Sequence, residues 1–402
     1  MQVALIYSIL TVMLVFTGLT VAIILGKAWR ESVEVYHRAR RREIEPAVLA
    51  YAHGEAGSVL PGLGGQVRFR DRNVVENVLL EFIQRVRGIE RDRLGRAFDE
   101  LGYVDSNLEQ LRSSRWWYRA EAAEKLGLSG ARRATEQLSS ALNDDEPEVR
   151  IRAATALGKV GGKASVIPLI GALNEPNRWS TIRIADILTG MGTEVVHELV
   201  QSWDDLSHTG RLAAIDIFGR IRLLDAVPWL RQRISDQHAD IRARAAHALG
   251  AIAEPGSAEP LQALINDPEW PVRAMAAKAL GRIRDRDSIP ILTASLRDPE
   301  WWVRANAAEA LRLMGPEGID ALIGMLDDTD NYARHQAVLM LGEAGEIDAW
   351  AEQLAVHDGT ALDRIRRVIR SGQTGRLEEL AGLHPDPVVR TRIRELMRSD
   401  RS

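Results

Sequence analysis

Two patterns of apolar and polar residues divide the chain. Residues 3–26 form an uncharged run, VALIYSILTVMLVFTGLTVAIILG. From about residue 114 onward, apolar positions recur at the three- and four-residue spacing of amphipathic helices. The first pattern is typical of a helix in lipid and the second of helices that bury one face, so the two regions need separate interpretations.

The apolar run is long enough to cross a bilayer. Its 24 residues would span roughly 36 Å as an α-helix. Basic residues follow the run, at Lys27, Arg30 and within 38–42, and none precedes it, which by the positive-inside rule puts the N-terminus outside and the rest in the cytoplasm. A cleaved signal peptide would need a basic start and a shorter run. We therefore expect an uncleaved single-pass anchor in the inner (plasma) membrane.

Small residues line one face of this predicted anchor. Gly18, Ala22 and Gly26 are four residues apart, and close approach across small residues is what packs helices together in lipid. Such strips also arise by chance, because glycine and alanine are common in membrane spans. The strip predicts packing against another membrane helix, with a plain tether as the alternative.

The second region is a repeat. A Leu-Gly step or its equivalent recurs every 30 or 31 residues, at Leu126, Leu157, Leu188, Phe218, Leu249, Leu280, Leu311 and Leu341. Each unit contains an alanine-rich helix followed by a second, apolar helix with an early proline, as in 288–296. Two short helices cannot bury their apolar faces alone, so neighbouring units must stack into an all-α solenoid.

Local signals predict where these helices begin and end. In the clearest copies Asp267 would be the N-cap and Pro268 the first helical residue, and Gly281 would end the helix. Upstream, Pro46 would end the cytoplasmic extension of the anchor helix.

An arginine stands seven residues before the anchor position in seven of the eight units, as at Arg242 and Arg273. It could form a basic groove for phosphates or an Asp-Arg ladder between units. The acids that accompany it favour the ladder.

These patterns predict four segments. They are a transmembrane anchor at 1–27, a cytoplasmic helical linker and N-terminal cap at 28–113, the repeat solenoid at 114–345, and degenerate repeats with a C-terminal cap at 346–402.

The unit resembles a known repeat. The string D-P-E-x-x-V-R-x-x-A-A-x-A-L-G resembles HEAT repeats of the short, bilin-lyase-like bacterial subtype, over residues 114–345. The large excess of arginine over lysine is also typical of G+C-rich bacterial genomes. In layout the chain resembles bacterial membrane-anchored HEAT proteins, some of which accompany membrane glycosyltransferases of exopolysaccharide synthesis. The resemblance implies a cytoplasmic scaffold or adaptor for a protein partner; the alternative is a bilin-lyase-like or other modifying enzyme.

Catalytic signals are weak. The chain has no cysteine, which excludes thiolate chemistry. GKVGGKAS at 158–165 lacks the spacing of a phosphate-binding loop, and His197-Glu198 stands alone where a di-iron site needs several such pairs. The formal net charge of −4 does not favour a nucleic-acid groove. We therefore expect no enzyme activity, no cofactor, no metal and no nucleic acid, and the sequence leaves the oligomeric state open.

Aromatic residues occupy two columns at the start of the first helices. Ten residues before the anchor position stand Trp116, Trp270 and Trp301; nine before it stand Trp117, Trp179, Trp302 and Tyr332. The first column aligns with alanines and is predicted to pack between units. The second aligns with polar positions, so its rings are predicted to stay partly exposed and to bind a protein partner, with packing as the alternative.

Overall fold

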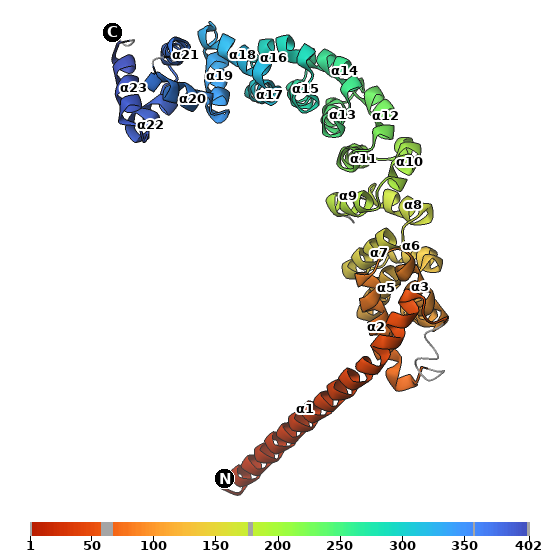
Figure 1. Cartoon of the computed structure of the whole chain (residues 1–402). Helices are drawn as coiled ribbons and strands as arrows, with labels where there is room; N and C mark the ends of the chain where they lie inside the picture. The colour runs from red at the N-terminus through yellow and green to blue at the C-terminus, as the bar shows by residue number, and fades with distance from the viewer. Residues whose placement is uncertain (1, 58–66, 176–179, 357, 400–402) are drawn as a thin grey trace. The chain divides into compact units, whose positions relative to one another are not determined.

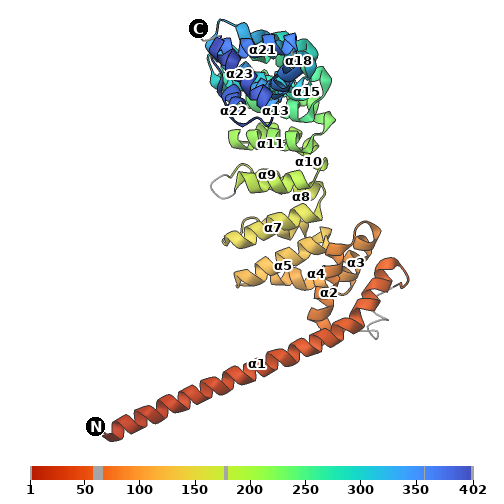
Figure 2. The ribbon, with the colours of Figure 1, turned by 60° about the vertical axis from the view of Figure 1, so that its left-hand side comes forward.

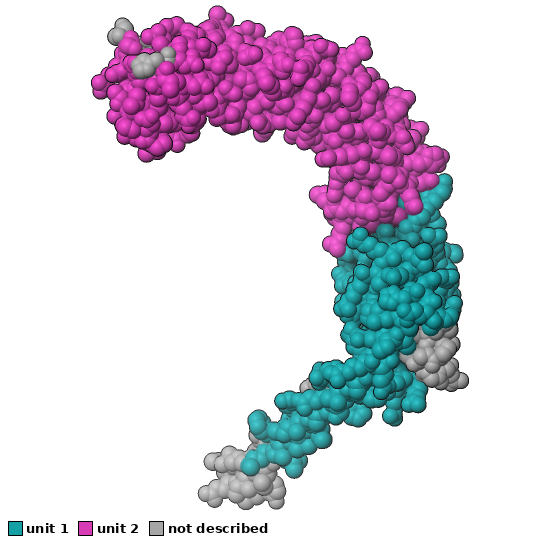
Figure 3. Space-filling model, viewed as in Figure 1, with its two compact units in different colours: residues 1–168 teal, residues 169–402 magenta. Residues whose placement is uncertain are grey.

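The computed structural model describes residues 2–57, 67–175, 180–356 and 358–399, and the side chains of these residues except 2–12, 15 and 30. Every regular element in this part of the chain is a helix, as the all-α prediction requires. The chain divides into two compact units, residues 1–168 and 169–402 (Figure 3). The division lies inside the predicted array, and each unit is described by itself below.

Unit 1 joins a long helix to a helical cap and the first repeats. Its helices are α1 (Gln2–His53), α2 (Arg72–Arg85), α3 (Ile89–Glu100), α4 (Tyr103–Gln110), α5 (Trp116–Ser129), α6 (Thr135–Ala141) and α7 (Pro147–Val160). Helices α5 and α7 pack side by side (Figure 2), and α2 packs against α5. A salt bridge of 2.9 Å from Lys125 to Glu76 joins this cap to the first repeat. Helix α8 (Lys163–Ala172) crosses the division between the units.

Helix α1 does not end at Pro46, contrary to the prediction. Pro46 lies inside the helix, which continues to His53. Proline removes one backbone hydrogen bond, but Val48 and Ala52 beyond it are buried, and α1 packs there against α2 and α3. Burial of this last stretch therefore outweighs the local cost of the proline.

In the N-terminal half of α1, the apolar side chains that the structure describes, from Met13 to Leu25, are exposed. Figures 1 and 2 show this half of the helix extending away from the other helices of unit 1. The transmembrane prediction for residues 3–26 is not supported, since no helix in the described part of the chain combines the length and apolarity of a membrane span. The side chains of residues 2–12, which form much of the predicted span, lie outside the described residues.

Unit 2 consists of paired helices in two rows (Figure 1). The first row contains α9 (Thr181–Gly190), α11 (His208–Ile221), α13 (Ala239–Ile252), α15 (Trp270–Ile283) and α17 (Trp301–Leu313). The second contains α10 (Glu194–Gln201), α12 (Val227–Arg233), α14 (Ala258–Ala263), α16 (Ile289–Ser295) and α18 (Pro316–Gly324). Beyond these rows lie α19 (Asn331–Glu343), α20 (Glu346–Gln353), α21 (Gly359–Arg370), α22 (Gly375–Leu383) and α23 (Pro387–Ser399). Neighbouring first-row helices pack directly on one another, which is the predicted stacking.

The repeated glycine spaces the first-row helices; it does not end them. Helix α15 continues past Gly281 to Ile283, and Arg284, at φ +60°, is the left-handed residue that closes it. A Cβ on Gly281 would lie 2.6 Å from Ala310 Cα and 2.7 Å from its Cβ. Gly250 meets Ala279 in the same way, with 2.5 Å from the added Cβ to Ala279 Cα. The prediction that Gly281 ends the helix was therefore wrong: glycine is needed for close approach.

The start of helix α15 also differs from the prediction. Asp267 is not the N-cap of α15; Glu269 is, and Pro271 stands in the first turn of the helix. The Asp267 carboxylate instead accepts a 2.9 Å hydrogen bond from the Glu269 backbone N–H, which forms a turn ahead of the helix. This backbone turn directs the Asp267 side chain toward the neighbouring repeat.

The close approach at Gly281 predicts that a substitution favoured by helix propensity will destabilise the protein. Alanine is favoured over glycine inside a helix by about 1 kcal/mol. Gly281→Ala should nevertheless destabilise the protein, because the new methyl group overlaps the backbone of Ala310. Gly171→Ala in α8, where the added Cβ meets nothing within 4 Å, is the matched control and should be neutral or stabilising. Urea unfolding of the full chain measures both; a stabilised Gly281→Ala variant would contradict the packing.

Candidate protein-binding surface

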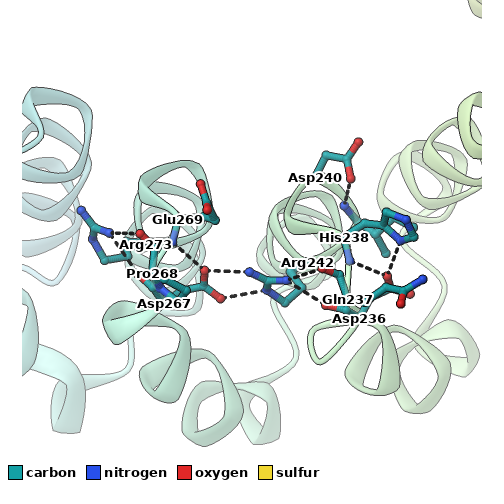
Figure 4. Close-up of polar contacts among 10 residues, drawn as sticks. Asp236, Gln237, His238, Asp240, Arg242, Asp267, Pro268, Glu269 and Arg273 are labelled. Atoms are coloured by element: carbon teal, nitrogen blue, oxygen red, sulfur yellow. Dashed lines mark hydrogen bonds and ion pairs between the residues drawn. The ribbon is translucent and has the colours of Figure 1, made fainter.

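One arginine in each clear repeat fixes the start of its own helix. Arg242 donates from Nη1 to the backbone carbonyls of Asp236 (2.8 Å) and Gln237 (3.2 Å). Arg273 does the same to Asp267 (3.0 Å) and Pro268 (3.1 Å). These carbonyls belong to the turn that leads into the helix, so the guanidinium ties the turn to the helix that follows (Figure 4).

The same guanidinium reaches the next repeat. Arg242 Nε and Nη2 bind both carboxylate oxygens of Asp267, at 2.8 and 2.9 Å, and Arg273 binds Asp298 at the same two distances. In unit 1, Arg119 binds Asp144 with two bonds of 2.7 Å. The Asp-Arg ladder predicted from the sequence is confirmed at these three steps.

The ladder stops at Arg304. The interval from Leu311 to Leu341 is 30 residues, one shorter than the two intervals before it. Asp328 binds Arg297 instead, and the Arg304 Nε atom, buried in the described structure, has no hydrogen-bond acceptor there. The Arg304 guanidinium lies 4.7 Å from the ring centroid of Tyr332. An aromatic ring therefore takes the place beside arginine that a carboxylate has in the earlier repeats.

Exposed aromatic rings line the edge of unit 2 at which this ladder runs. We name Trp270, Trp301, Trp302 and Tyr332 the aromatic ridge; they stand in the first turns of α15, α17 and α19, which pack side by side. Their exposed fractions run from 39% for Trp270 to 63% for Tyr332. The Trp301 and Trp302 rings meet edge to face, with centroids 4.7 Å apart. All four rings of the ridge are thus open to solvent, and three of them are also held by a neighbouring side chain: Trp301 and Trp302 by each other, and Tyr332 by Arg304.

The two predicted columns do not differ as expected. Trp117, Trp302 and Tyr332 are exposed, as predicted for the second column, but Trp116, Trp270 and Trp301 are exposed as well. Side chains in a helix lean toward its N-terminus, and a ring in the first turn has no preceding turn beneath it. The face on which such a residue falls therefore does not decide its burial. Trp179 lies outside the described residues.

Unit 1 has its own aromatic cluster at the start of α5. Trp117 meets Trp116 edge to face at 6.0 Å and lies 6.0 Å from Tyr118, and the Arg115 guanidinium stands 5.7 Å from the Trp117 ring. Three tryptophans of unit 2 are structural instead. Trp203 packs on Trp229 with centroids 4.6 Å apart, and Trp203 and Trp350 are buried. Exposure, rather than residue type, distinguishes the candidate binding rings.

The remaining predicted site lies on α1. Gly18 and Gly26 face open space, since an added Cβ would meet nothing within 4 Å. Ala22 is exposed between them. Among the described residues, no group of three or more histidine, aspartate or glutamate side chains is arranged to hold a metal.

Comparison with protein families identifies the repeat. The family model for HEAT repeats matches residues 104–187, 196–270 and 260–342, more than half of the chain. The chain belongs to the HEAT-repeat family. The match is to HEAT repeats in general, and it covers most of the array predicted at 114–345. No curated protein matches the chain.

Comparison with solved structures gives alignments along most of this chain. An engineered protein is 18% identical with a TM-score of 0.34, and the alignment covers 90% of this chain and 99% of that one. Kap121p bound to Pho4p is 14% identical with a TM-score of 0.45, covering 90% of this chain and 49% of that one. This chain therefore spans about half the length of the Kap121p structure. At these values the likeness concerns the fold alone.

The Asp-Arg ladder predicts that removing the charge of one of its aspartates lowers the free energy of unfolding. Asp267→Asn keeps the shape of the side chain but removes the charge that Arg242 faces, and should destabilise the protein by about 2 kcal/mol. Asp287→Asn, at an exposed position in the short 3-10 helix Arg286–Ser288 before α16, is the matched control, expected within about 0.5 kcal/mol of wild type. Urea unfolding of the full chain measures both changes.

Lowering the pH should remove the stability that the Asp267–Arg242 ion pair contributes. Burial raises the pKa of Asp267, but hydrogen bonds from Arg242 and the Glu269 N–H outweigh it and hold the pKa below the usual value of an aspartate. A carboxyl group with a lowered folded pKa contributes stability above its unfolded pKa and loses it as the pH falls through the folded value. The urea midpoint of Asp267→Asn should therefore approach that of wild type below about pH 4. A constant difference from pH 7 down to pH 2 would contradict the ionic ladder.

Proposed function

We propose that this HEAT protein is a non-enzymatic scaffold or adaptor that binds a protein partner through the aromatic ridge. The observation that carries the proposal is the ridge itself: four large rings, all exposed, on three neighbouring helices of unit 2. A single exposed apolar residue is ordinary. Several exposed tryptophan and tyrosine rings on neighbouring helices have the composition that dominates protein-binding hot spots.

The rings are held in place for binding. They project from the first turns of packed helices, whose starts in α15 and α17 are tied by Arg273 and Arg304 to the preceding backbone carbonyls. Tyr332 is held against the Arg304 guanidinium, and Trp302 against Trp301. A partner would therefore immobilise few side chains on binding, which lowers the entropic cost of association. Trp117 in unit 1 has the same surroundings, and we propose it as a second contact; the same role for Trp179 follows only from its place in the sequence.

We propose further that α1 holds the protein at a membrane. The support is the uncharged run of residues 3–26 together with the exposure of the described apolar side chains within it, from 49% for Val21 to 76% for Leu14. Exposed apolar surface of this extent is costly in water unless lipid or another helix covers it. Gly18, Ala22 and Gly26 would then be the packing strip. The resemblance of this layout to that of bacterial membrane-anchored HEAT proteins suggests a membrane glycosyltransferase complex for exopolysaccharide as the partner.

The ridge can be tested by removing its two most exposed rings. Trp302→Ala with Tyr332→Ala should lower recovery of the partner from detergent-solubilised native membranes about tenfold. The melting temperature should fall by no more than about 2 °C, since these rings are mostly exposed. The matched control is Leu224→Ala with Val356→Ala, which removes two exposed apolar side chains elsewhere in unit 2 and should leave recovery unchanged. Equal recovery with the ridge variant, by quantitative mass spectrometry, would exclude the ridge as the binding surface.

Membrane attachment has a separate test. A chain lacking residues 2–26 should move from the carbonate-washed membrane fraction to the supernatant, while Gly18→Leu with Ala22→Leu should stay in the membrane because the helix remains apolar. If the strip packs against another span, the double variant should also lose its crosslinked assembly. A C-terminal alkaline phosphatase fusion, active only outside the cytoplasm, should be silent. Membrane retention of the shortened chain would contradict the anchor.

A further inference from the structure

A groove of about 770 Å³ lies in unit 2 over α9, α11, α13 and α15. Its floor is formed by small and apolar side chains, among them Ala213, Ala248 and Ala251, with Leu212 and the exposed Ile182 at one side. The groove lies beside the second half of α15, whereas the aromatic ridge begins at the first residue of that helix. It is therefore a second surface of the same unit.

Most cations near the groove are neutralised by an acid. The acid stands two residues before the anchor position in three first-row helices, at Asp186, Asp216 and Glu309. Arg220 binds Asp186 at 2.7 Å, Arg244 binds Asp216, and Arg312 binds Glu309 at 2.5 Å. Exposed pairs of this kind contribute little stability, but they cancel the charge of this face.

Two adjacent helices break the pattern. The corresponding positions in α13 and α15 are His247 and Lys278, so the acid is missing twice in succession. Lys278 and Arg282, one helical turn apart on α15, have no ion-pair partner in the part of the chain that the structure describes. Arg282 Nη1 lies 3.3 Å from His247 Nε2, and because arginine only donates, this nitrogen accepts. Arg222, at another wall of the groove, is exposed and likewise has no ion pair among the described residues.

The local potential at this place is positive. Burial lowers the pKa of His247, and the charges of Arg282, Lys278 and Arg244 lower it further. His247 is therefore neutral at pH 7 and can accept the Arg282 hydrogen bond. Arg222 and Arg282 line the groove, and Lys278 lies one turn from Arg282 on α15. These cations without an acidic partner, beside apolar side chains, favour a ligand that brings its own carboxylates and apolar side chains.

We propose that this groove binds an acidic linear segment of a partner protein, with the carboxylates of the segment on Lys278, Arg282 and Arg222 and its apolar side chains on the alanine floor. A nucleic acid fits the surface less well. None of the residues that line the groove is a tryptophan, tyrosine or phenylalanine on which bases could stack.

The inference rests on the proposed function only in that both concern a protein partner. The two surfaces use different residues, so each can fail alone. Loss of ridge binding would leave the groove intact, and the ridge variant Trp302→Ala with Tyr332→Ala should bind the acidic probe as wild type does.

The test uses the purified full chain and a fluorescein-labelled peptide of fifteen residues in which Glu and Leu alternate, followed by fluorescence anisotropy. Lys278→Glu with Arg282→Glu should weaken binding at least about tenfold. Arg394→Glu with Arg398→Glu is the matched control, because these exposed arginines are also one turn apart, on α23, and their reversal changes the net charge equally. The control should stay within about twofold of wild type.

Peptide and salt controls complete the test. A peptide with Gln in place of Glu should bind at least about tenfold more weakly, and added salt should weaken the Glu peptide. Four results would overturn the proposal: no binding of the Glu peptide to wild type, equal binding of the Gln peptide, equal loss in the α23 control, or tighter binding of a fifteen-nucleotide single-stranded DNA than of the peptide.

Discussion

The array depends on a guanidinium that serves two repeats at once. In the clear copies, one side of the arginine holds two carbonyls at the start of its own helix, and the other side holds an aspartate of the next repeat, as Arg242 holds Asp267. Arginine can do this because its planar fork presents several donors in fixed directions, whereas lysine has a single charged nitrogen. These hydrogen bonds therefore set both the residue at which a helix begins and the spacing to the next repeat.

This constraint explains which surfaces are free for a partner. Close packing of the first-row helices is carried by glycine against alanine, as at Gly281 and Ala310, and the helix starts are tied by arginine. Neither the glycine–alanine contact nor the arginine hydrogen bonds require a large aromatic ring. The rings at Trp301, Trp302 and Tyr332 therefore stay at the edge with much of their surface open to solvent, in a geometry that the arginines fix. Cohesion and recognition use different side chains of the same helical turns.

The sequence predicted the parts of this account that depend on spacing. A period of 30 or 31 residues required stacked helix pairs, and the coupled positions of Arg242 and Asp267 indicated the ladder. It did not predict the role of Gly281, because a glycine near a helix end has the same signature whether it closes the helix or meets a neighbouring backbone. The groove was also missed, although the missing acids at His247 and Lys278 are a signal that the aligned repeats contain.

Residue spacing alone could not predict whether the aromatic columns are buried or exposed. A helical wheel assumes that a residue is flanked by turns on both sides, and Trp270 and Trp301 are the first residues of their helices. Pro46 shows the converse case, in which tertiary packing of Val48 and Ala52 overrides a strong local signal. Both predictions failed because a local sequence rule was applied at the end of a helix or at a packed surface.

Site-specific photocrosslinking in living cells can establish whether the aromatic ridge is the surface that binds the partner. A photoreactive phenylalanine analogue would be placed singly at Trp302, at Tyr332 and, for comparison, at Leu224. We expect the two ridge positions to crosslink to the same protein, and position 224 not to crosslink to it. Crosslinks of equal yield at all three positions, or none at the ridge while the partner still co-purifies, would contradict the claim that the ridge is the recognition surface.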